Sequence, residues 1–240
     1  MFVRLIKAIS MGMHTLHASM SYREDIVMMY KELTAITQET SNDCTQYLIN
    51  KGLLPRPPYV TMPDAVEFVH DKSYMSGFNP FGNKRALNTV EAAHIYYTIE
   101  TNVTGMQMIT GFAQCAHEKE VKQYFSQGVE LAKSIIKEFN EMLLQSGVQP
   151  PSTSGGNATS STVAPFSDKI MMYCTSLFCG FSLSKNALGT AFSLRNDIPA
   201  KATVLTKDIF EYAHQGAKLM IKHGWMGEPP QMEERNQLLN

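Results

Sequence analysis

Charged residues are scarce in this 240-residue sequence, and neither sign of charge is concentrated anywhere. Lys and Arg number 21 and Asp and Glu number 22, which gives a formal net charge of −1 at pH 7. Nucleic acids and anionic membranes attract basic clusters, and the sequence has no such cluster. We therefore expect no nucleic-acid partner.

Long hydrophobic runs are also absent. The longest mainly apolar, uncharged stretch is residues 170–183, which is shorter than the roughly 20 residues that a membrane-spanning helix needs. Near the start, Arg4 and Lys7 precede apolar positions as in a signal peptide, but His14 and His17 interrupt the apolar run and no A-x-A-like cleavage site follows. We expect no membrane segment and a cytoplasmic location.

Motifs for cofactor or nucleotide chemistry are few. The four cysteines form neither a CxxC pair nor a zinc-finger spacing. Cys174 and Cys179 lie five positions apart, so on one helix they would point about 140° away from each other. No glycine-rich phosphate loop and no G-x-S-x-G sequence occur. We expect reduced, buried thiols in a cytosolic protein, and the sequence identifies no small-molecule ligand.

What the sequence does contain is an internal repeat. A shift of 172 positions places residues 21–26 (SYREDI) on residues 193–198 (SLRNDI) without a gap. The same shift pairs Gly52 with Gly224, and Pro57-Pro58 with Pro229-Pro230. A single register kept over about 49 positions indicates a duplicated unit. Each copy is predicted to be a helical hairpin.

The repeated Ser-x-Arg-x-Asp sequence predicts the corner of that hairpin. Asp25 and Asp197 are expected to be N-caps of the second helix, and Gly52 and Gly224 are expected to end it in the left-handed conformation. The arginine two positions before each aspartate is expected near the end of the preceding helix, where its charge suits the exposed carbonyls. A helix-turn-helix staple is favoured here over a ligand-binding loop.

A second kind of hairpin lies between the two copies. The sequence Asn88-x-x-Glu91 predicts a capping box, and apolar residues at helical spacing predict helices near 89–115 and 119–146. A stretch rich in Pro, Gly, Ser and Thr, residues 147–165, separates them from a helix over 168–196. Nineteen extended residues reach roughly 60 Å, so this stretch can start the third helix parallel to the second. We predict an all-α fold with a ferritin-like four-helix bundle and a long crossover.

Several motifs together resemble the family called domain of unknown function 3231. They are Arg85-Ala-Leu-Asn88-x-x-Glu91-x-x-His94-Ile, Pro165-Phe-Ser-Asp-Lys-Ile-Met-Met172, Ser193-x-Arg-x-Asp-Ile198, Gly52-x-x-x-Arg-Pro-Pro-Tyr59 and Gly224-Trp225-x-x-x-Pro-Pro230. The resemblance covers nearly the whole chain. It implies tandem ferritin-like four-helix units, an origin mainly in endospore-forming Gram-positive bacteria, and no established activity. It also implies two complete units, so this chain would begin inside the third helix of a truncated first unit.

These observations divide the chain into four segments. We expect the second hairpin of a truncated first repeat at residues 1–58, an inter-repeat linker at 59–84, a complete four-helix unit at 85–230, and a C-terminal tail at 231–240.

Two Glu-x-x-His pairs are the candidate metal ligands. Glu91 with His94, and Glu211 with His214, each place a carboxylate and an imidazole one turn apart on a helix. Ferritin-like proteins bind iron or manganese with two such pairs and one Glu from each remaining helix, but residues 168–196 contain no Glu. The alternative is that Glu91 caps its helix, that His94 is half-buried, and that Glu211 and His214 form a local pair.

Two functions follow from the sequence. The first is a structural or interaction role, because the hairpin of residues 3–52 would expose apolar side chains that need a cover. These side chains are Leu5, Ile9, Leu33, Ile36 and Tyr47. Self-association is therefore expected unless the hairpin packs on the complete bundle. The second is a metal-dependent ferritin-like oxidoreductase, and the sequence favours the non-enzymatic role.

Overall fold

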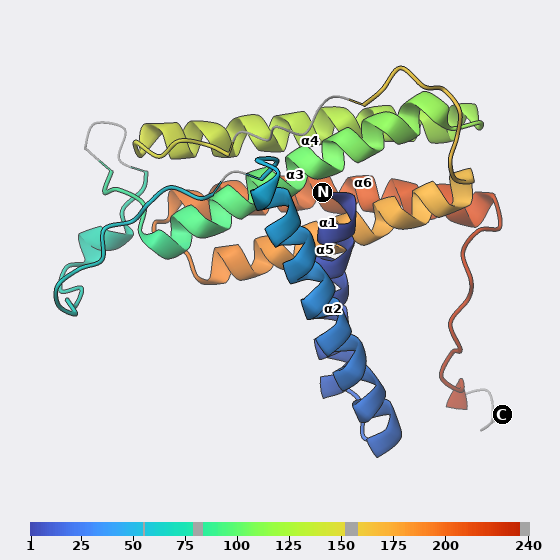
Figure 1. Ribbon diagram of the computed structural model, residues 1–240, viewed down its shortest axis with the longest axis horizontal. Coiled ribbons are helices and arrows are strands. Elements are labelled where there is room, and N and C mark those ends of the chain that lie inside the picture. Colours follow the sequence, from blue (N-terminus) through green and yellow to red (C-terminus); the bar gives the residue numbers. More distant parts are fainter. Residues whose placement is uncertain (55, 79–83, 152–157, 236–240) are drawn as a thin grey trace.

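The described part of the chain consists of helices and the segments that connect them (Figure 1). The computed structural model describes residues 1–54, 56–78, 84–151 and 158–235, and no strand occurs within them. The helices are α1 (Phe2–Ser19), α2 (Glu24–Asn50), the short 3-10 helix η1 (Lys72–Met75), α3 (Thr89–Cys115), α4 (Lys119–Gln145), α5 (Asp168–Ala191) and α6 (Asp197–Lys222). The predicted all-α class is confirmed.

Several helix ends follow directly from local sequence. The capping box before α3 is present, because the Asn88 side chain accepts a hydrogen bond from the Glu91 amide at 2.8 Å while the Glu91 carboxylate accepts one from the Asn88 amide at 3.1 Å. Gly52 and Gly224 follow α2 and α6 with φ of 65° and 67°, a conformation that glycine adopts without steric penalty. These predictions are confirmed.

Three predictions at the corners were wrong. Asp25 and Asp197 are not N-caps, since α2 begins at Glu24 and α6 begins at Asp197 itself. Both aspartates lie inside the first helical turn, where a negative charge still interacts favourably with the helix dipole. The helix α5 ends at Ala191 rather than at residue 196, because contacts with the start of α3 hold residues 193–196 in a separate turn.

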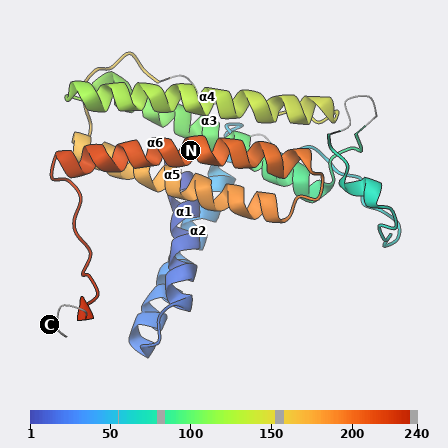
Figure 2. The ribbon, with the colours of Figure 1, turned by 180° about the vertical axis from the view of Figure 1, so that it is seen from behind.

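The helices α3 to α6 form a four-helix bundle from two antiparallel hairpins, with α3 packed on α5 and α4 packed on α6 (Figure 2). The helix α5 begins beside the start of α4, where the Asp168 carboxylate accepts hydrogen bonds from the amides of His117 and Glu118, the latter at 2.8 Å. The helix α5 therefore starts parallel to α4, as the sequence predicted.

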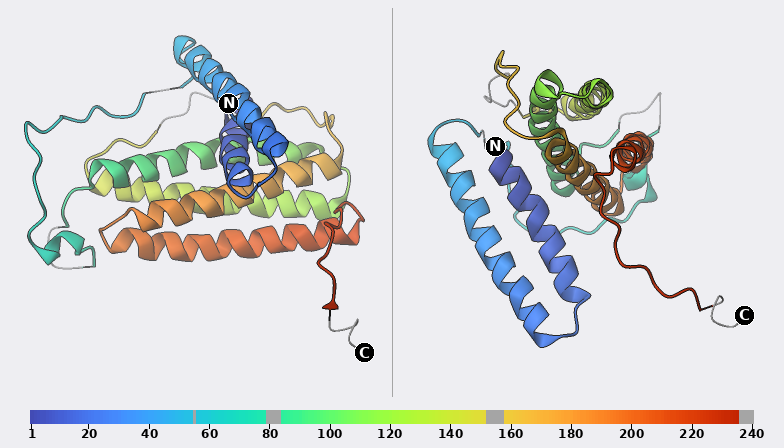
Figure 3. Two further views of the ribbon diagram at one scale, coloured as in Figure 1. Left: turned by 90° about the horizontal axis from the view of Figure 1, so that it is seen from below. Right: turned by 90° about the vertical axis from the view of Figure 1, so that its right-hand side faces the viewer.

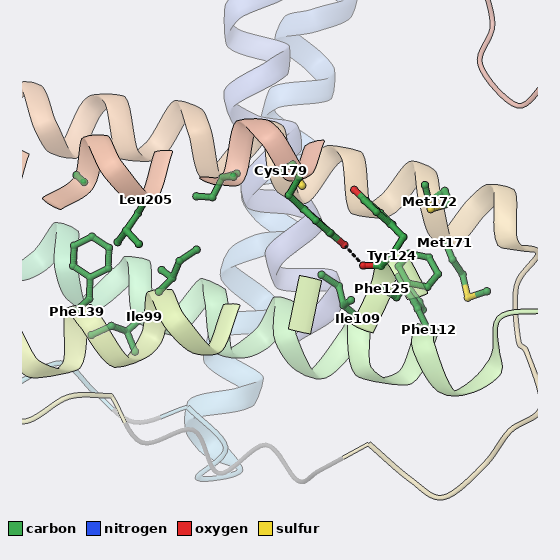
Figure 4. Packing of buried hydrophobic residues seen from close by; sticks show 14 of the residues in the cluster. Ile99, Ile109, Phe112, Tyr124, Phe125, Phe139, Met171, Met172, Cys179 and Leu205 are labelled. Atoms are coloured by element: carbon green, nitrogen blue, oxygen red, sulfur yellow. Dashed lines mark hydrogen bonds between the residues drawn. The ribbon is translucent and has the colours of Figure 1, made fainter. Parts of the chain in front are cut away.

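Two tyrosines and two glycines fix the contact between α4 and α6. The ring of Tyr124, which is labelled in Figure 4, stacks on that of Tyr212 with the centroids 4.3 Å apart. The Tyr212 hydroxyl donates a hydrogen bond to the Tyr124 carbonyl at 3.2 Å. A Cβ atom at Gly128 would overlap the Tyr212 hydroxyl, and one at Gly216 would overlap the Tyr124 hydroxyl. Glycine is therefore needed at both positions for the rings to pack this closely.

The α1–α2 hairpin crosses the bundle and projects away from it (Figure 3). Only the first half of α1 is packed on α3 and α5, where Leu5 and Ile9 are buried. Leu33, Ile36 and Tyr47 of α2 are exposed. The hairpin thus packs on the bundle over part of its length and leaves its outer part uncovered. Within the described residues, no helix has both the length and the apolar character needed to cross a membrane.

Candidate functional site

The corner between α5 and α6 surrounds a buried carboxylate from α3. The side chain of Glu91 is fully buried and accepts two hydrogen bonds from the Arg85 guanidinium, at 2.7 and 2.8 Å. It also accepts hydrogen bonds from the amides of Leu194 and Arg195, at 3.1 and 3.0 Å. Burial alone would raise the pKa of the Glu91 carboxyl, but the hydrogen bonds from Arg85 and from the amides lower it to about 2.

The segment before α3 closes this corner from outside. The Arg195 guanidinium donates to the Asp197 carboxylate at 2.8 Å and to the Arg85 carbonyl at 2.9 Å. The Asn196 amide donates to the Met75 carbonyl at 3.0 Å. Gly77 lies so close to Asp197 that a Cβ atom there would overlap its carboxylate. Part of the predicted linker therefore packs against the end of the bundle.

The corner between α1 and α2 has the same arginine–aspartate pair, but there it is exposed to solvent. The Arg23 guanidinium donates to the Asp25 carboxylate at 3.1 and 2.6 Å, as Arg195 does to Asp197. The Arg23 side chain is 77% exposed, whereas the Arg195 side chain is 3% exposed. Tyr22, next to Arg23, is almost fully exposed. The first copy thus has the arginine–aspartate pair, but none of the described residues covers it as Glu91 and its neighbours cover the second.

Both corners support the staple interpretation, with one change. Each arginine was predicted to interact with carbonyls at the end of the preceding helix, but Arg23 and Arg195 pair instead with an aspartate in the first turn of the next helix. Arg85 donates the two shortest hydrogen bonds to the Glu91 carboxylate, and no role for it was predicted from the sequence. The available signal was a single arginine placed six positions before the capping glutamate.

The structure does not gather the four candidate metal ligands into one cluster. The Glu91 carboxylate is occupied by its hydrogen bonds, and the half-buried His94 ring stacks on Phe192. Glu211 and His214 lie on the exposed side of α6, where Glu211 pairs with Lys207 at 3.5 Å and the His214 ring stacks on Phe210. Among the described residues, no group of three or more His, Cys, Asp and Glu side chains is placed to hold a metal ion.

The four cysteines are unpaired, as the sequence predicted. Cys115 and Cys179 are buried, while Cys44 and Cys174 are half-buried. Burial raises the pKa of the Cys179 thiol to about 12 and also raises that of Cys174. Because the thiolate is the reactive form, neither of these two thiols is suited to nucleophilic chemistry.

One solved structure has a similar fold. It is the crystal structure of a putative spore coat protein from Bacillus halodurans C-125, which matches with a TM-score of 0.60 and 16% sequence identity. The similarity covers 62% of this chain and 98% of that protein. At this level of identity the likeness concerns the fold alone. Among curated proteins, no sequence matches the chain.

A family model matches the sequence over two ranges, residues 1–66 and residues 75–238. Together the two ranges include all six α-helices and both corners. Because the match extends over most of the sequence, the chain belongs to the family of proteins of unknown function described as DUF3231.

Proposed function

We propose that this chain is a non-enzymatic structural protein that associates with a second copy of itself through the α1–α2 hairpin. The observation that carries the proposal is a row of exposed apolar residues on α2, which we name the outer stripe: Met29, Leu33, Ile36 and Tyr47. Intervals of four, three and eleven positions keep these side chains on one side of a helix. Monomeric proteins rarely expose contiguous apolar patches of this kind unless the patch is used for binding.

A second copy of the same hairpin suits this surface for a structural reason. The repeat aligns α1–α2 with α5–α6, and α5–α6 is covered by another antiparallel hairpin, α3–α4. An isolated hairpin is half of a four-helix bundle, so two α1–α2 hairpins related by a two-fold axis would supply four helices. The exposed apolar residues of α1 would add to the same interface; they are Val3, Met13, Leu16 and Met20.

The setting that we propose is the spore of an endospore-forming bacterium. Support comes from the similar Bacillus halodurans protein, which is named for the spore coat. We also assign the α3–α6 bundle to the ferritin-like class, on the basis of its two antiparallel hairpins and the connection that runs the length of the bundle. The unpaired thiols support a cytoplasmic location.

Sedimentation velocity over a wide range of protein concentration tests the association. The wild-type chain is expected to shift from monomer to dimer as its concentration rises. Replacing Ile36, which is 57% exposed, by Glu should leave a folded monomer, because a charge in an apolar interface is strongly unfavourable. Val204→Glu is the matched control, since Val204 on α6 is 62% exposed and lies outside the hairpin. A wild-type monomer at every concentration would rule out the proposal, and so would equal effects of the two substitutions.

A metal-dependent oxidoreductase is the second proposal. The spacing within Glu91-x-x-His94 and Glu211-x-x-His214 supports it, whereas the engagement of Glu91 by Arg85 and two amides weighs against it. Metal analysis of protein from cells supplied with iron or manganese separates the two proposals. The structural proposal predicts less than about a tenth of an equivalent of bound metal and no loss of stability in Glu211→Ala. Stoichiometric metal that is lost in Glu211→Ala would favour the oxidoreductase.

A further inference from the structure

A partly open cavity of about 70 Å³ lies between the helices of the bundle at the place where α1 crosses it. Most of its lining is apolar and comes from α3, α4, α5 and α6, while Leu5 and Ile9 of α1 close one side. Two of the lining residues, Ile109 and Cys179, are visible among the buried side chains in Figure 4. A single water needs only about 10–15 Å³, so the cavity has room for a larger molecule.

One residue lining this cavity is a lysine without a carboxylate partner. Lys185 is only 7% exposed, and its ammonium group donates a hydrogen bond to the hydroxyl of Thr101, which also lines the cavity. Among the described residues, no carboxylate oxygen lies within 4.0 Å of it, and the nearby Glu100 pairs with Arg4 of α1 instead. Burial lowers the pKa of Lys185 to about 7, and the attraction of the Glu100 carboxylate only partly offsets this effect. The low pKa reflects the cost of burying a charge that has no directly paired carboxylate.

A second polar group in the lining is also unsatisfied. The Ser182 hydroxyl is buried and has no hydrogen-bond partner among the described residues. A lysine ammonium has three N–H donors, of which Thr101 accepts one. Buried donors are normally satisfied, so these two side chains provide unused donors in an otherwise apolar cavity. An acceptor with a negative charge would satisfy both of them.

We propose that the cavity binds a small aliphatic monocarboxylate. Its carboxylate accepts hydrogen bonds from Lys185 and Ser182, and its short alkyl chain occupies the apolar part of the cavity. A single buried cation matches one negative charge, whereas a phosphate dianion would remain partly uncompensated in these surroundings. Sites that bury a small ligand are lined mainly by apolar side chains with a few polar groups that orient the ligand, and the residues that line this cavity fit that description. This function is separate from the association of the hairpins, because the outer stripe does not line the cavity.

Isothermal titration calorimetry of the full chain with hexanoate, and with hexan-1-ol as the uncharged analogue, tests the proposal. Wild-type protein should bind hexanoate saturably and at least about tenfold more tightly than hexan-1-ol. Lys185→Met should remove that preference, and Ser182→Ala should weaken hexanoate binding several-fold. Equal affinity for the two probes would overturn the proposal, and so would a lack of saturable hexanoate binding.

A pair of glycines on α3 provides a matched test of where the probe binds. Gly105 lines the cavity and has open space around its Cβ position, so Gly105→Met should fill the cavity and abolish hexanoate binding. Gly111 also lies on α3 with open space around its Cβ position, but it is not part of the cavity lining. Gly111→Met should bind hexanoate as the wild type does. Unchanged binding by Gly105→Met would place the probe elsewhere and contradict the proposal.

Discussion

The corners at residues 21–25 and 193–197 have the same arginine–aspartate pair in different surroundings. In the first corner the pair is in solvent, and in the second it lies beneath residues that lead into α3. An ion pair between exposed side chains contributes about 0–1 kcal/mol, whereas removal of one partner from a buried network costs about 3–5 kcal/mol. The local sequence thus specifies the pair, and the tertiary cover determines how much stability depends on it.

The largest effect is expected from removal of the carboxylate that only the second corner has. Glu91→Ala should lower the free energy of unfolding by about 3–5 kcal/mol, because Arg85 and two backbone amides lose their buried acceptor. Asp25→Ala in the exposed first corner is the control and should leave the free energy of unfolding nearly unchanged, because solvent screens its ion pair with Arg23. Chemical denaturation monitored by circular dichroism measures both changes. Similar losses in the two variants would mean that the corners are equally covered.

Low pH should destabilise the folded protein through protonation of Glu91 in the second corner. The pKa of Glu91 is lowered from 4.5 to about 2 in the folded protein. The folded state therefore binds this proton less readily than the unfolded state, so the stabilising contribution is complete above pH 4.5 and is lost as the pH falls toward 2. The loss should reach about 3 kcal/mol. Denaturation curves at several pH values should show a shallower decrease for Glu91→Gln, and parallel curves for the two proteins would contradict this assignment.

The same substitution at both arginines compares their contributions to stability. Arg195→Met should destabilise the protein by about 2–3 kcal/mol, because the Arg85 carbonyl loses its donor and Asp197 loses a buried partner. Arg23→Met should have an effect of less than about 0.5 kcal/mol, since the side chain is in solvent. Thermal denaturation of both variants under identical conditions measures the difference. An effect of Arg23→Met as large as that of Arg195→Met would show that the first corner is also covered.

The repeat places Met13 at the position that corresponds to Lys185. Lys185→Met therefore puts the residue of the first copy into the second, and it should stabilise the protein by about 1–3 kcal/mol at pH 7 by removing a buried, unpaired amine. The lowered pKa of Lys185 means that the unfolded state binds its proton more readily between pH 7 and 10.5. Stability from this group therefore rises with pH in that interval, by up to about 1.4 kcal/mol per pH unit.

Urea denaturation of the wild type and Lys185→Met from pH 7 to pH 10 compares the two slopes. The stability advantage of the variant should shrink as the pH rises. A constant difference across this interval would show that Lys185 is fully charged in the folded protein.

A smaller difference in stability is expected when corresponding positions in the second helix of each copy, α2 and α6, are substituted. Gly216 of α6 corresponds to Cys44 of α2, and the Tyr124 ring lies directly against Gly216. Gly216→Ala should destabilise by about 1–2 kcal/mol because the Tyr124 ring must move. Cys44→Ala should have an effect of less than about 1 kcal/mol, and calorimetry of the two variants measures both. A neutral Gly216→Ala would mean that the tyrosine stack can shift without loss.

Local signals in the sequence were sufficient for several helix ends and for the direction of α5. Asn88 and Glu91 specified the start of α3, the two glycines with positive φ specified the ends of α2 and α6, and the length of the connection before α5 allowed its direction to be predicted. Each of these features depends on residues that are close in the chain. Local steric and hydrogen-bonding preferences therefore carry the information.

Features that depend on contacts between distant residues were not predictable. The early end of α5 results from hydrogen bonds between Glu91 and the amides of residues 194 and 195, more than a hundred positions away. Leu5 and Ile9 dock on the bundle while Leu33 and Ile36 do not, although all four are apolar residues at helical spacing. The cavity lysine could have been noticed as the only charged residue between Lys169 and Arg195, but its missing partner required the structure.

The central claim is that other residues cover the corner at residues 193–197, whereas the corner at residues 21–25 is exposed to solvent. Amide hydrogen exchange at the two corners tests this claim most directly. The amides of Leu194, Arg195 and Asn196 donate to Glu91 and to the Met75 carbonyl, whereas within the described residues those of Tyr22 and Arg23 have no partner from outside their hairpin. Measured on dilute, monomeric protein, residues 194–196 should exchange at least about a hundredfold more slowly than residues 22–23. Equal protection at the two corners would contradict the account.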